Sequence, residues 1–326
     1  MKSMTRRFSI TLALSAWLLA AVPGLATAEY PERPITLVIP YTPGGPADVL
    51  GRYVAQKIGA TFGQPVIVEN KPGASLTIGT DYVSRAKPDG YTLLLGAASM
   101  LVQSAAGRTP QQNLRDFTPI SVIGTFPTVL TVNPKLPVNN VQELIAYAKK
   151  HPDELYYGSS GIGSLTHLAG ALFEHMADLK MTHVPYRGVN EAMNDMASGQ
   201  IQLAFPGAPI GLPLAKTGRV RALAVTSPER TATDPSLPTI AESGLQGYAV
   251  NPWYGLLAPT GTPRPIIDRW HAEILRVLQD PEVKRHWLTL GADPAYSKTP
   301  EAFASMMRDE SERWAELIQS ANIQLK

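Results

Sequence analysis

The sequence predicts an α/β fold built from two lobes. Short apolar, β-branched runs alternate with segments whose apolar residues recur at helical spacing, which is typical of parallel strands joined by crossover helices. The alternation occurs in two sets, the first beginning at Ile35 and the second at Tyr156. About 300 residues remain once the first 28 are set aside, a length near which single cores stop growing. Two separate sheets are therefore expected.

The first 28 residues are expected to be a signal peptide. They combine basic residues that include Arg6 and Arg7 with an apolar run over residues 10–22 and the motif Ala26-Thr27-Ala28. The apolar run is too short to span a membrane. We therefore expect general secretion, cleavage after Ala28, and a periplasmic protein that is not membrane-embedded.

Composition excludes several functional classes. The signal peptide holds three of the 29 basic residues and none of the 27 acidic ones, so the mature chain has 26 basic and 27 acidic residues, a formal charge of −1. A near-neutral chain with few basic runs argues against nucleic acid as a partner. The absence of cysteine excludes disulfides, thiolate metal sites and a lipidated cysteine anchor.

The most informative segment lies where the first strand meets the first helix. Residues 35–39 are apolar except for Thr36 and largely β-branched, as in a strand buried on both faces. Pro43-Gly44-Gly45 forms a tight turn, and Pro46 suits the first position of the helix that follows. The N–H groups and positive dipole end of this helix favour an anion, with Asp48 holding the glycine loop. The alternative is that glycine and proline serve only the chain reversal.

The rest of the first set continues the alternation and indicates a parallel sheet with crossover helices. Strands are expected at 66–68, 91–96, 120–123 and 128–132, and helices at 77–86 and at 141–149, the latter begun by Asn139 or Asn140.

A second turn rich in small donors lies in residues 156–168. Its glycines allow close backbone approach, and Ser164 is a good N-cap for the helix that follows. Hydroxyl groups come from Ser159, Ser160, Ser164 and Thr166. Two helix starts without a lysine suit a small carboxylate better than a nucleotide, because neither a P-loop nor a complete dinucleotide fingerprint is present. Simple turn chemistry is the alternative for Ser159 and Ser160.

The remaining elements complete a second sheet and a helical tail. They are expected at 182–185, 190–198, 201–205 and 221–226, followed by an extended crossing at 251–259 and helices at 265–278, 281–290 and 300–321, each opened by a proline. This assigns residues 29–128 with 252–326 to lobe 1 and residues 129–251 to lobe 2.

No catalytic or metal-binding constellation stands out in the sequence. The nucleophile-elbow and H-E-x-x-H patterns are both absent, so no catalytic residue, metal or cofactor is assigned. His167 follows Ser164 closely and either faces a cleft or bonds to a neighbouring loop, the second being favoured.

Collinear motifs along the mature chain resemble the Bug family (UPF0065), the periplasmic solute-binding proteins of tripartite tricarboxylate transporters. They cover essentially the whole mature chain and read YPERPI from Tyr30, PYTPGGPAD from Pro40, VENKPGA from Val68, KPDGYTL from Lys87, GSSG from Gly158, GS from Gly163, HLAG from His167, HVPYRG from His183, RALAVT from Arg221 and APTGTP from Ala258.

The resemblance implies a type II periplasmic-binding fold, with two α/β lobes that close on a carboxylate in the cleft between them. It also implies integral membrane subunits as partners, and a monomer is expected. Ligand contacts carried over by position fall on backbone groups and small hydroxyls rather than on an arginine clamp. In lobe 1 they are Tyr41, Pro43, Gly44, Gly73, Ala74 and the Ala98-Ser99 turn; in lobe 2 they are Ser159, Ser160, Ser164, Thr166, Tyr186 and the turn at Gly207.

The chain departs from the family pattern at two places. Ser75-Leu76 stands where relatives often have two glycines, and the third cleft loop carries the apolar Met100. Either these side chains cover the pocket, which would admit an aromatic acid beside aliphatic di- and tricarboxylates, or they pack in the core. A binding partner of a sensor protein is an alternative function, and a secreted enzyme acting on carboxylic acids is a weaker one.

Overall fold

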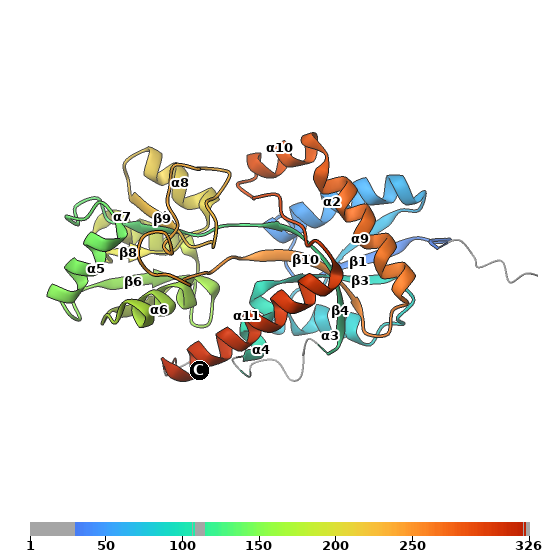
Figure 1. The fold of residues 1–326 in the computed structure, drawn as a ribbon, viewed down its shortest axis with the longest axis horizontal. Helices are drawn as coiled ribbons and strands as arrows, with labels where there is room; N and C mark the ends of the chain where they lie inside the picture. The colour runs from blue at the N-terminus through green and yellow to red at the C-terminus, as the bar shows by residue number, and fades with distance from the viewer. Residues whose placement is uncertain (1–29, 106, 108–114, 322, 324–326) are drawn as a thin grey trace, which may run out of the picture. The chain divides into compact units, whose positions relative to one another are not determined.

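Two five-stranded sheets organise the protein. The computed structural model describes residues 30–105, 107, 115–321 and 323, so the expected signal peptide lies outside the described residues. All strands and helices below belong to one unit, Arg33–Lys326 (Figure 1). Among the described residues, no helix is both long and apolar enough to cross a membrane.

The first sheet has the strand order β2-β1-β3-β10-β4. β1 pairs in parallel with β2 and β3, with Ile35 opposite Val66, whereas β10 pairs antiparallel with β3 and β4. Its strands are β1 (Ile35–Ile39), β2 (Val66–Asn70), β3 (Thr92–Ala97), β4 (Phe117–Thr125) and β10 (Trp253–Pro259). The helices between them are α2 (Pro46–Phe62), the short 3-10 helix η1 (Ala74–Leu76), α3 (Thr77–Ser84) and α4 (Ala98–Ala105).

The second sheet repeats this arrangement in the order β7-β6-β8-β5-β9. β6 is parallel to β7 and β8, and β5 is antiparallel to β8 and β9. Its strands are β5 (Val129–Val132), β6 (Tyr156–Ser159), β7 (Thr182–Pro185), β8 (Leu203–Ala204) and β9 (Arg221–Val225). Its helices are α5 (Val141–Lys150), α6 (Leu165–Ala177), α7 (Val189–Ser198) and α8 (Ala208–Lys216).

The sheets are parallel with crossover helices only in part, because each sheet contains one reversed strand, β10 in the first and β5 in the second. β10 enters the first sheet directly after the chain leaves the second, and β5 enters the second directly after β4 ends in the first. The two connecting segments run side by side, since the N–H of Phe126 donates to Pro252 O at 2.8 Å (Figure 1). A strand that arrives from the other sheet, without a crossover helix, is free to pair antiparallel.

Three C-terminal helices complete the first sheet's packing: α9 (Arg264–Gln279), α10 (Pro281–Thr289) and α11 (Pro300–Ser320). Trp287 of α10 is fully buried, and its indole N–H donates to Ile123 O at 2.7 Å. The indole N–H groups of Trp253 and Trp314 donate to the buried carboxylate of Glu310 at 2.6 and 3.2 Å. These bonds satisfy large aromatic side chains inside the core.

Local sequence signals place most helix starts correctly. Pro46 opens α2, and the side chains of Asn140 and Ser164 accept N–H bonds at the starts of α5 and α6. Two helices were missed. α4 begins at Ala98 where a loop was expected, and α8 contains Pro213, a residue that normally interrupts a helix.

Candidate functional site

The expected site residues lie where parallel strands end. In an α/β sheet, ligands bind outside the carboxyl ends of the strands, where the chain turns into helices. The strand ends of the first sheet carry Tyr41 and Pro43 (after β1), Gly73 and Ala74 (after β2) and Ser99 (after β3); those of the second carry Ser159 and Ser160 (β6), Tyr186 (β7) and Gly207 (β8). Each sheet therefore gathers its expected contacts at one edge.

The first glycine turn is held by a network centred on Asp48. The Gly44 N–H donates to Asp48 Oδ2 at 2.9 Å, and Asn70 Nδ2 donates to Asp48 Oδ1 at 2.8 Å and to Tyr41 O at 3.1 Å. Arg52 Nε lies 3.0 and 2.9 Å from the two carboxylate oxygens. The N–H of Gly44 is therefore engaged within the protein, as the expected role of Asp48 in holding the loop requires.

Asp48 is 4% exposed, and its charge is matched on several sides. Burial raises the pKa of its carboxyl group, but hydrogen bonds from Arg52, Gly44 and Asn70 lower it further than burial raises it. The N–H groups of the first turn of α2 have no partner within the helix and stay directed toward the strand's carboxyl end. The network thus fixes the turn at the N-terminal end of α2.

Tyr41 and Ser99 meet across the ends of β1 and β3. Tyr41 Oη lies 2.7 Å from Ser99 Oγ, and the ring of Tyr41 packs edge-on against that of Tyr254, with centroids 6.1 Å apart. Burial raises the pKa of Tyr41 to about 12, while the Ser99 hydroxyl lowers it slightly. The phenol is therefore neutral at pH 7 and keeps a proton to donate.

The Pro-Gly-Ala turn after β2 has an unusual backbone. Gly73 has φ 124°, and Ala74 and Leu76 have φ 46° and 78°, a region that side chains other than glycine rarely adopt. Such conformations persist only where the surrounding structure imposes them, and they concentrate at ligand-binding segments. Leu76 thus adopts the left-handed conformation that glycine favours.

Leu76 and Met100, the two apolar residues considered for the pocket, pack inside the protein. Met100 is 8% exposed and belongs to the main core cluster, and Leu76 is partly buried against the same cluster. Both residues therefore fit the interpretation in which they pack in the core. Their packing gives no support for an aromatic ligand.

The second turn presents a cluster of three hydroxyl groups. Thr166 Oγ1 accepts the Ser160 N–H at 2.9 Å and lies 3.0 Å from Ser160 Oγ and 2.9 Å from Ser164 Oγ. Ser164 Oγ donates to Gly161 O at 2.7 Å and accepts the His167 N–H at 3.2 Å, which caps α6. Ser160 is exposed, so its hydroxyl is available to a ligand.

Ser159 plays a different part from its neighbour. It is 1% exposed, its hydroxyl accepts the Gly161 N–H at 3.1 Å, and it lies 2.7 Å from His183 Nε2. The buried Ser159 hydroxyl therefore stabilises the turn from within the protein. These contacts fit the alternative considered for Ser159, in which its side chain serves only the conformation of the turn.

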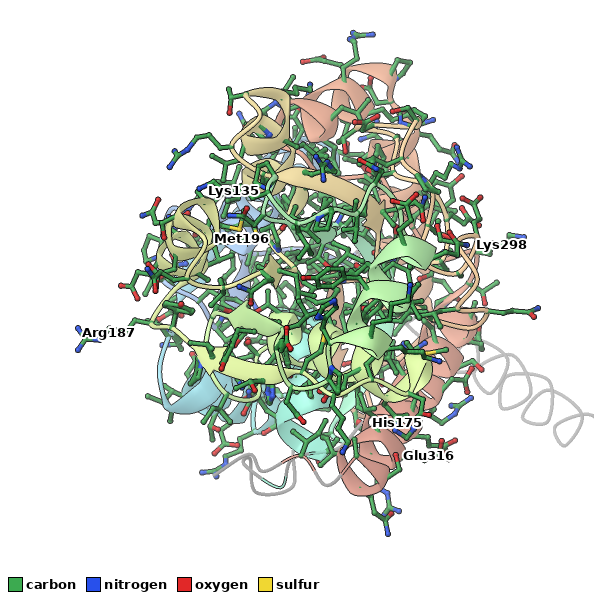
Figure 2. All side chains as sticks on the ribbon, turned by 90° about the vertical axis from the view of Figure 1, so that its left-hand side faces the viewer. Lys135, His175, Arg187, Met196, Lys298 and Glu316 are labelled. Carbon is green, nitrogen blue, oxygen red and sulfur yellow. The ribbon has the colours of Figure 1, made fainter. Side chains whose placement is uncertain are left out.

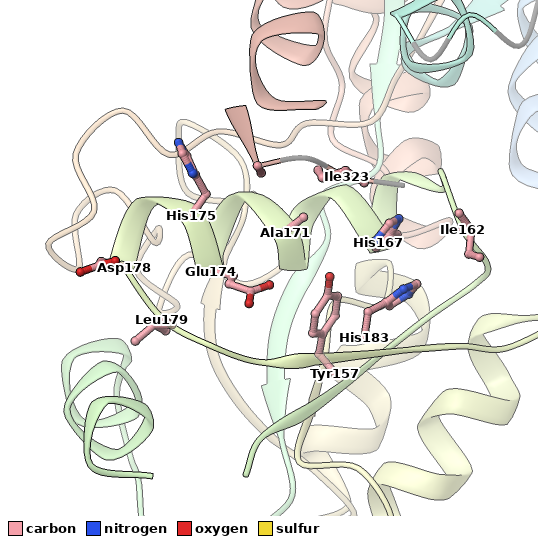
Figure 3. Close-up of a pocket in the computed structure, with 11 residues that line it drawn as sticks. Tyr157, Ile162, His167, Ala171, Glu174, His175, Asp178, Leu179, His183 and Ile323 are labelled. Atoms are coloured by element: carbon pink, nitrogen blue, oxygen red, sulfur yellow. The ribbon is translucent and has the colours of Figure 1, made fainter. Parts of the chain in front are cut away.

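Aromatic side chains pack beneath the second glycine turn. Tyr157, His167 and His183 gather beneath the start of α6, with the two imidazoles stacked at 3.8 Å (Figure 3). His167 is buried and its Nδ1 accepts the Gly163 N–H at 3.1 Å, so it bonds to a neighbouring loop as favoured from the sequence. Burial lowers the pKa of His183 to about 4, which keeps this ring neutral at pH 7.

Tyr186 and Gly207 complete the second edge. Tyr186 Oη donates to Asp195 Oδ2 at 2.9 Å, and burial, together with Asp195, raises the pKa of Tyr186 to about 12. Gly207 is the N-cap of α8 and bridges to Thr128 across the sheet. Arg187, next to Tyr186, is exposed and its side chain points outward (Figure 2).

The expected contacts are mainly polar groups, and none of them has a cationic side chain. Neutral phenols, small hydroxyls and backbone N–H groups at helix starts can hold a carboxylate through several hydrogen bonds. In the part of the chain that the structure describes, no group of three His, Asp or Glu residues is arranged to hold a metal ion.

The residues that support the two turns are not among the contacts expected from the sequence. Arg52 and Asn70 fix Asp48, and His183 fixes Ser159, yet none of the three was proposed for the site. Arg52 follows Asp48 by four residues on one helix, a spacing that predicts an ion pair. Asn70 and His183 reach their partners through strand pairing and carry no local signal.

The chain is similar to proteins of one family. A family model described as "Tripartite tricarboxylate transporter family receptor" matches residues 50–323. Among curated relatives, protein BugT of Bordetella pertussis is 34% identical over 327 residues, covering 99% of this chain and 100% of BugT.

Solved structures of the same kind share the fold. A TctC solute-binding protein from Polaromonas has a TM-score of 0.82 at 32% identity, covering 89% of this chain and 99% of that one. Rpa4515 of R. palustris, solved with adipate, has a TM-score of 0.72 at 34% identity over 90% of this chain and 99% of that one. MatC from Rhodopseudomonas palustris, solved with bound malate, has a TM-score of 0.69 at 30% identity over 89% of this chain and 100% of that one.

Proposed function

The chain belongs to the tripartite tricarboxylate transporter receptor family, the Bug or UPF0065 proteins, and on that premise we propose that it captures a small carboxylate in the periplasm for a transporter of this type. Its family and structural neighbours are solute-binding proteins, not enzymes, and its two-lobed α/β fold is theirs. Export, with cleavage after Ala28, is part of the proposal.

The observation that carries this proposal is the pair of donor-rich edges. The Gly44 turn at the start of α2 and the Ser160 turn at the start of α6 each follow the first parallel strand of a sheet. Helix N-termini favour anions, and two of them suit a ligand with a carboxylate at each end. We assign residues 29–128 with 252–326 to one lobe and 129–251 to the other, and place the ligand between their edges.

An aliphatic dicarboxylate is the proposed ligand class. Rpa4515 was solved with adipate and MatC with malate, both dicarboxylates. The exposed hydroxyl of Ser160, together with Thr166 and Ser164, would receive one carboxylate, and Tyr41, Ser99 and the turn at Gly44 the other. Ser159 would act by holding the second turn in place. An aromatic acid is a less favoured ligand because Met100 and Leu76 pack in the core.

We propose that closure of the two lobes signals to the transporter that a ligand is bound. A ligand that contacts both edges binds the closed form more tightly than the open form, and this difference shifts the population toward closure. The two connections between the sheets, around residues 126 and 252, would act as the hinge. Membrane subunits of the transporter would then recognise the closed receptor.

A binding panel tests the ligand class. We would purify the chain from Glu29 onward and measure thermal shifts with succinate, malate, adipate, citrate, glutamate and benzoate, followed by calorimetry. A dicarboxylate at a concentration 100 times its Kd should stabilise the protein by about 2.7 kcal/mol without being consumed. Stabilisation by benzoate alone would overturn the aliphatic assignment, and consumption of a ligand would contradict the receptor function.

The transporter partnership needs a separate measurement. Deleting the gene in its host should reduce uptake of the identified ligand, and restoring the gene should recover it. Normal uptake in the deletion strain, with binding intact in vitro, would favour a sensor protein as the partner.

A further inference from the structure

A group of contacts joins the two proposed lobes beside the hinge. The loop that follows α10 contributes Gly291 and Asp293, the first turn of α8 contributes Pro209, and the loop that follows β9 contributes Thr231 and Ala232. α10 packs on the first sheet, whereas α8 and β9 belong to the second, and α8 and α10 lie beside each other (Figure 1). We call these five residues the latch.

Asp293 forms the polar part of the latch. Its Oδ1 accepts the Thr231 hydroxyl and the Ala232 N–H, both at 3.0 Å, and Thr231 is fully buried. Hydrogen bonds to an ionised acceptor are stronger than bonds between neutral groups. The backbone of Asp293 also pairs with Thr125 at the end of β4, with N–O distances of 2.9 and 3.0 Å. The carboxylate therefore ties the second lobe to the strand end at which the hinge begins.

Gly291 forms the close-packed part of the latch. Its φ is 71°, and a Cβ at this position would lie 2.6 Å from Pro209 Cγ and 3.2 Å from Cβ and Cδ of the same ring. Because the proline ring is rigid, it cannot turn away from such an atom. Only glycine therefore allows the loop after α10 to approach α8 this closely.

Each side of the latch is fixed to its own part of the protein. The buried indole of Trp287 bonds to β4, and the Ala292 N–H donates to Trp287 O at 3.0 Å. On the other side the Ala208 N–H donates to Pro127 O at 2.8 Å, just before β5. The helix start that touches the latch also carries Gly207, an expected carboxylate contact. A rotation of one lobe against the other would therefore strain the latch.

The latch is formed in a conformation that leaves expected ligand contacts open to solvent. Gly44 and Gly73 in lobe 1 and Ser160 in lobe 2 are exposed. A small ligand held between closed lobes would cover most of its binding surface. Contacts that exist in the open form and are lost on closure stabilise the open form alone.

We propose that the latch stabilises the open form of the receptor, so that Gly291, Asp293 and Pro209 lower the affinity for the carboxylate without touching it. This inference rests on the proposed function, because it requires a ligand that closes the lobes. The apparent affinity is reduced by the fraction of receptor in the binding-competent closed form. A latched open form also keeps the empty receptor distinct from the loaded one, which membrane subunits must tell apart.

Three variants weaken the latch at different points, and calorimetry with the dicarboxylate compares them. Asp293→Ala removes the acceptor, Pro209→Ala removes the ring at an exposed position, and Gly291→Ala inserts a methyl group for which the latch has no room. Each should bind the ligand at least about threefold more tightly, the factor expected for one lost contact in the open form. Gly218→Ala is the matched control, because Gly218 has φ 72° but open space around its Cβ position, and its Kd should not change.

Unchanged or weaker binding in both Asp293→Ala and Pro209→Ala would overturn the proposal. These two variants add no backbone strain, so they decide the question if Gly291→Ala fails to fold.

A second measurement needs no ligand. The chain has no cysteine, so Ile67→Cys and Thr182→Cys can carry two spin labels at exposed positions on β2 and β7, the outermost strands of the two sheets. Electron–electron double resonance on the empty protein should show part of the population at a shorter distance in Gly291→Ala and not in Gly218→Ala.

The distance measurement separates the latch from the proposed function. An unchanged distance distribution in Gly291→Ala and in Asp293→Ala would refute the latch, even if a dicarboxylate binds. A shorter distance in both variants, in a protein that binds no dicarboxylate, would support the latch and contradict the proposed function alone.

Discussion

Ser159 Oγ lies 2.7 Å from His183 Nε2, and this contact joins the second glycine turn to the rings beneath it. His183 belongs to β7, and the parallel pairing of β7 with β6 brings the two residues together. Because burial lowers the pKa of His183 to about 4, a neutral imidazole, rather than a charged one, supports the turn at pH 7.

Stability should fall in acid through His183. Its pKa is depressed from 6.5 to about 4 in the folded protein, so the unfolded chain binds more protons between these two values. The stabilisation is complete above pH 6.5 and is lost as the pH falls toward 4. Urea unfolding at pH 7.5, 6.0 and 4.5 should show this decline in the free energy of unfolding.

Replacing His183 measures how much of the loss of stability in acid its imidazole causes. His183→Gln should reduce the difference in unfolding free energy between pH 7.5 and pH 4.5, whereas His175→Gln, which alters an exposed histidine on α6, should not. An identical pH dependence in the protein and its His183→Gln variant would contradict the assigned role.

Asp48→Asn should destabilise the first turn. The substitution leaves the Gly44 N–H and the Arg52 guanidinium without their charged acceptor, and buried groups that lose a charged partner cost about 1–3 kcal/mol. Asp268→Asn is the control, because its exposed ion pair with Arg264 is expected to contribute less than about 1 kcal/mol. Urea unfolding at pH 7 compares the two variants, and equal effects would show that Asp48 does not hold the loop.

The same bonds predict how the Asp48 contribution depends on pH. The pKa of Asp48 is lowered on folding, so its stabilisation is present above the ordinary carboxyl pKa and is lost as the pH falls below it. In Asp48→Asn this part of the acid sensitivity should disappear, which repeating the unfolding measurement at pH 3 to 5 would reveal.

Features that depend on neighbouring residues could be predicted from the sequence. Pro46 at the start of α2, Ser164 as the cap of α6 and the collinear βα units all rest on spacings of a few residues. The number of sheets followed from chain length and from the two sets of alternating segments.

Features that depend on distant pairing could not. His183 reaches Ser159 across 24 positions and Asn70 reaches Asp48 across 22, distances at which periodicity carries no information. The reversed direction of β5 and β10 depends on the route of the chain between sheets. Helix α8 was not expected; it contains Pro213, a residue that normally interrupts a helix.

The hydroxyl cluster should contribute to carboxylate affinity, if the proposed ligand binds at the Ser160 turn. Thr166→Val keeps the shape of the side chain but removes the oxygen that accepts the Ser160 N–H and contacts two further hydroxyls. We expect the affinity for the dicarboxylate to fall about tenfold, equivalent to about 1.4 kcal/mol. Thr217→Val, at an exposed position after α8, should leave the calorimetric Kd unchanged. A wild-type Kd for Thr166→Val would exclude the cluster from the site.

Gly161 tests whether the backbone of the second turn is what the site requires. Its φ is 110°, which side chains rarely adopt, while a Cβ at this position would meet nothing closer than Tyr186 O at 3.6 Å. Gly161→Ala therefore adds backbone strain without a steric clash, and should destabilise the protein by at least about 1 kcal/mol. Gly188→Ala is the matched control, because Gly188 has φ −159° and open space around its Cβ position, and its effect should stay near 0.5 kcal/mol.

The same substitution should affect ligand binding. Because Gly161 O accepts the Ser164 hydroxyl and its N–H donates to Ser159, relaxation of the strained turn would also displace the hydroxyl cluster. Dicarboxylate affinity measured by calorimetry should consequently fall in Gly161→Ala and not in Gly188→Ala, whereas a loss of stability with unchanged affinity would separate the turn from ligand binding.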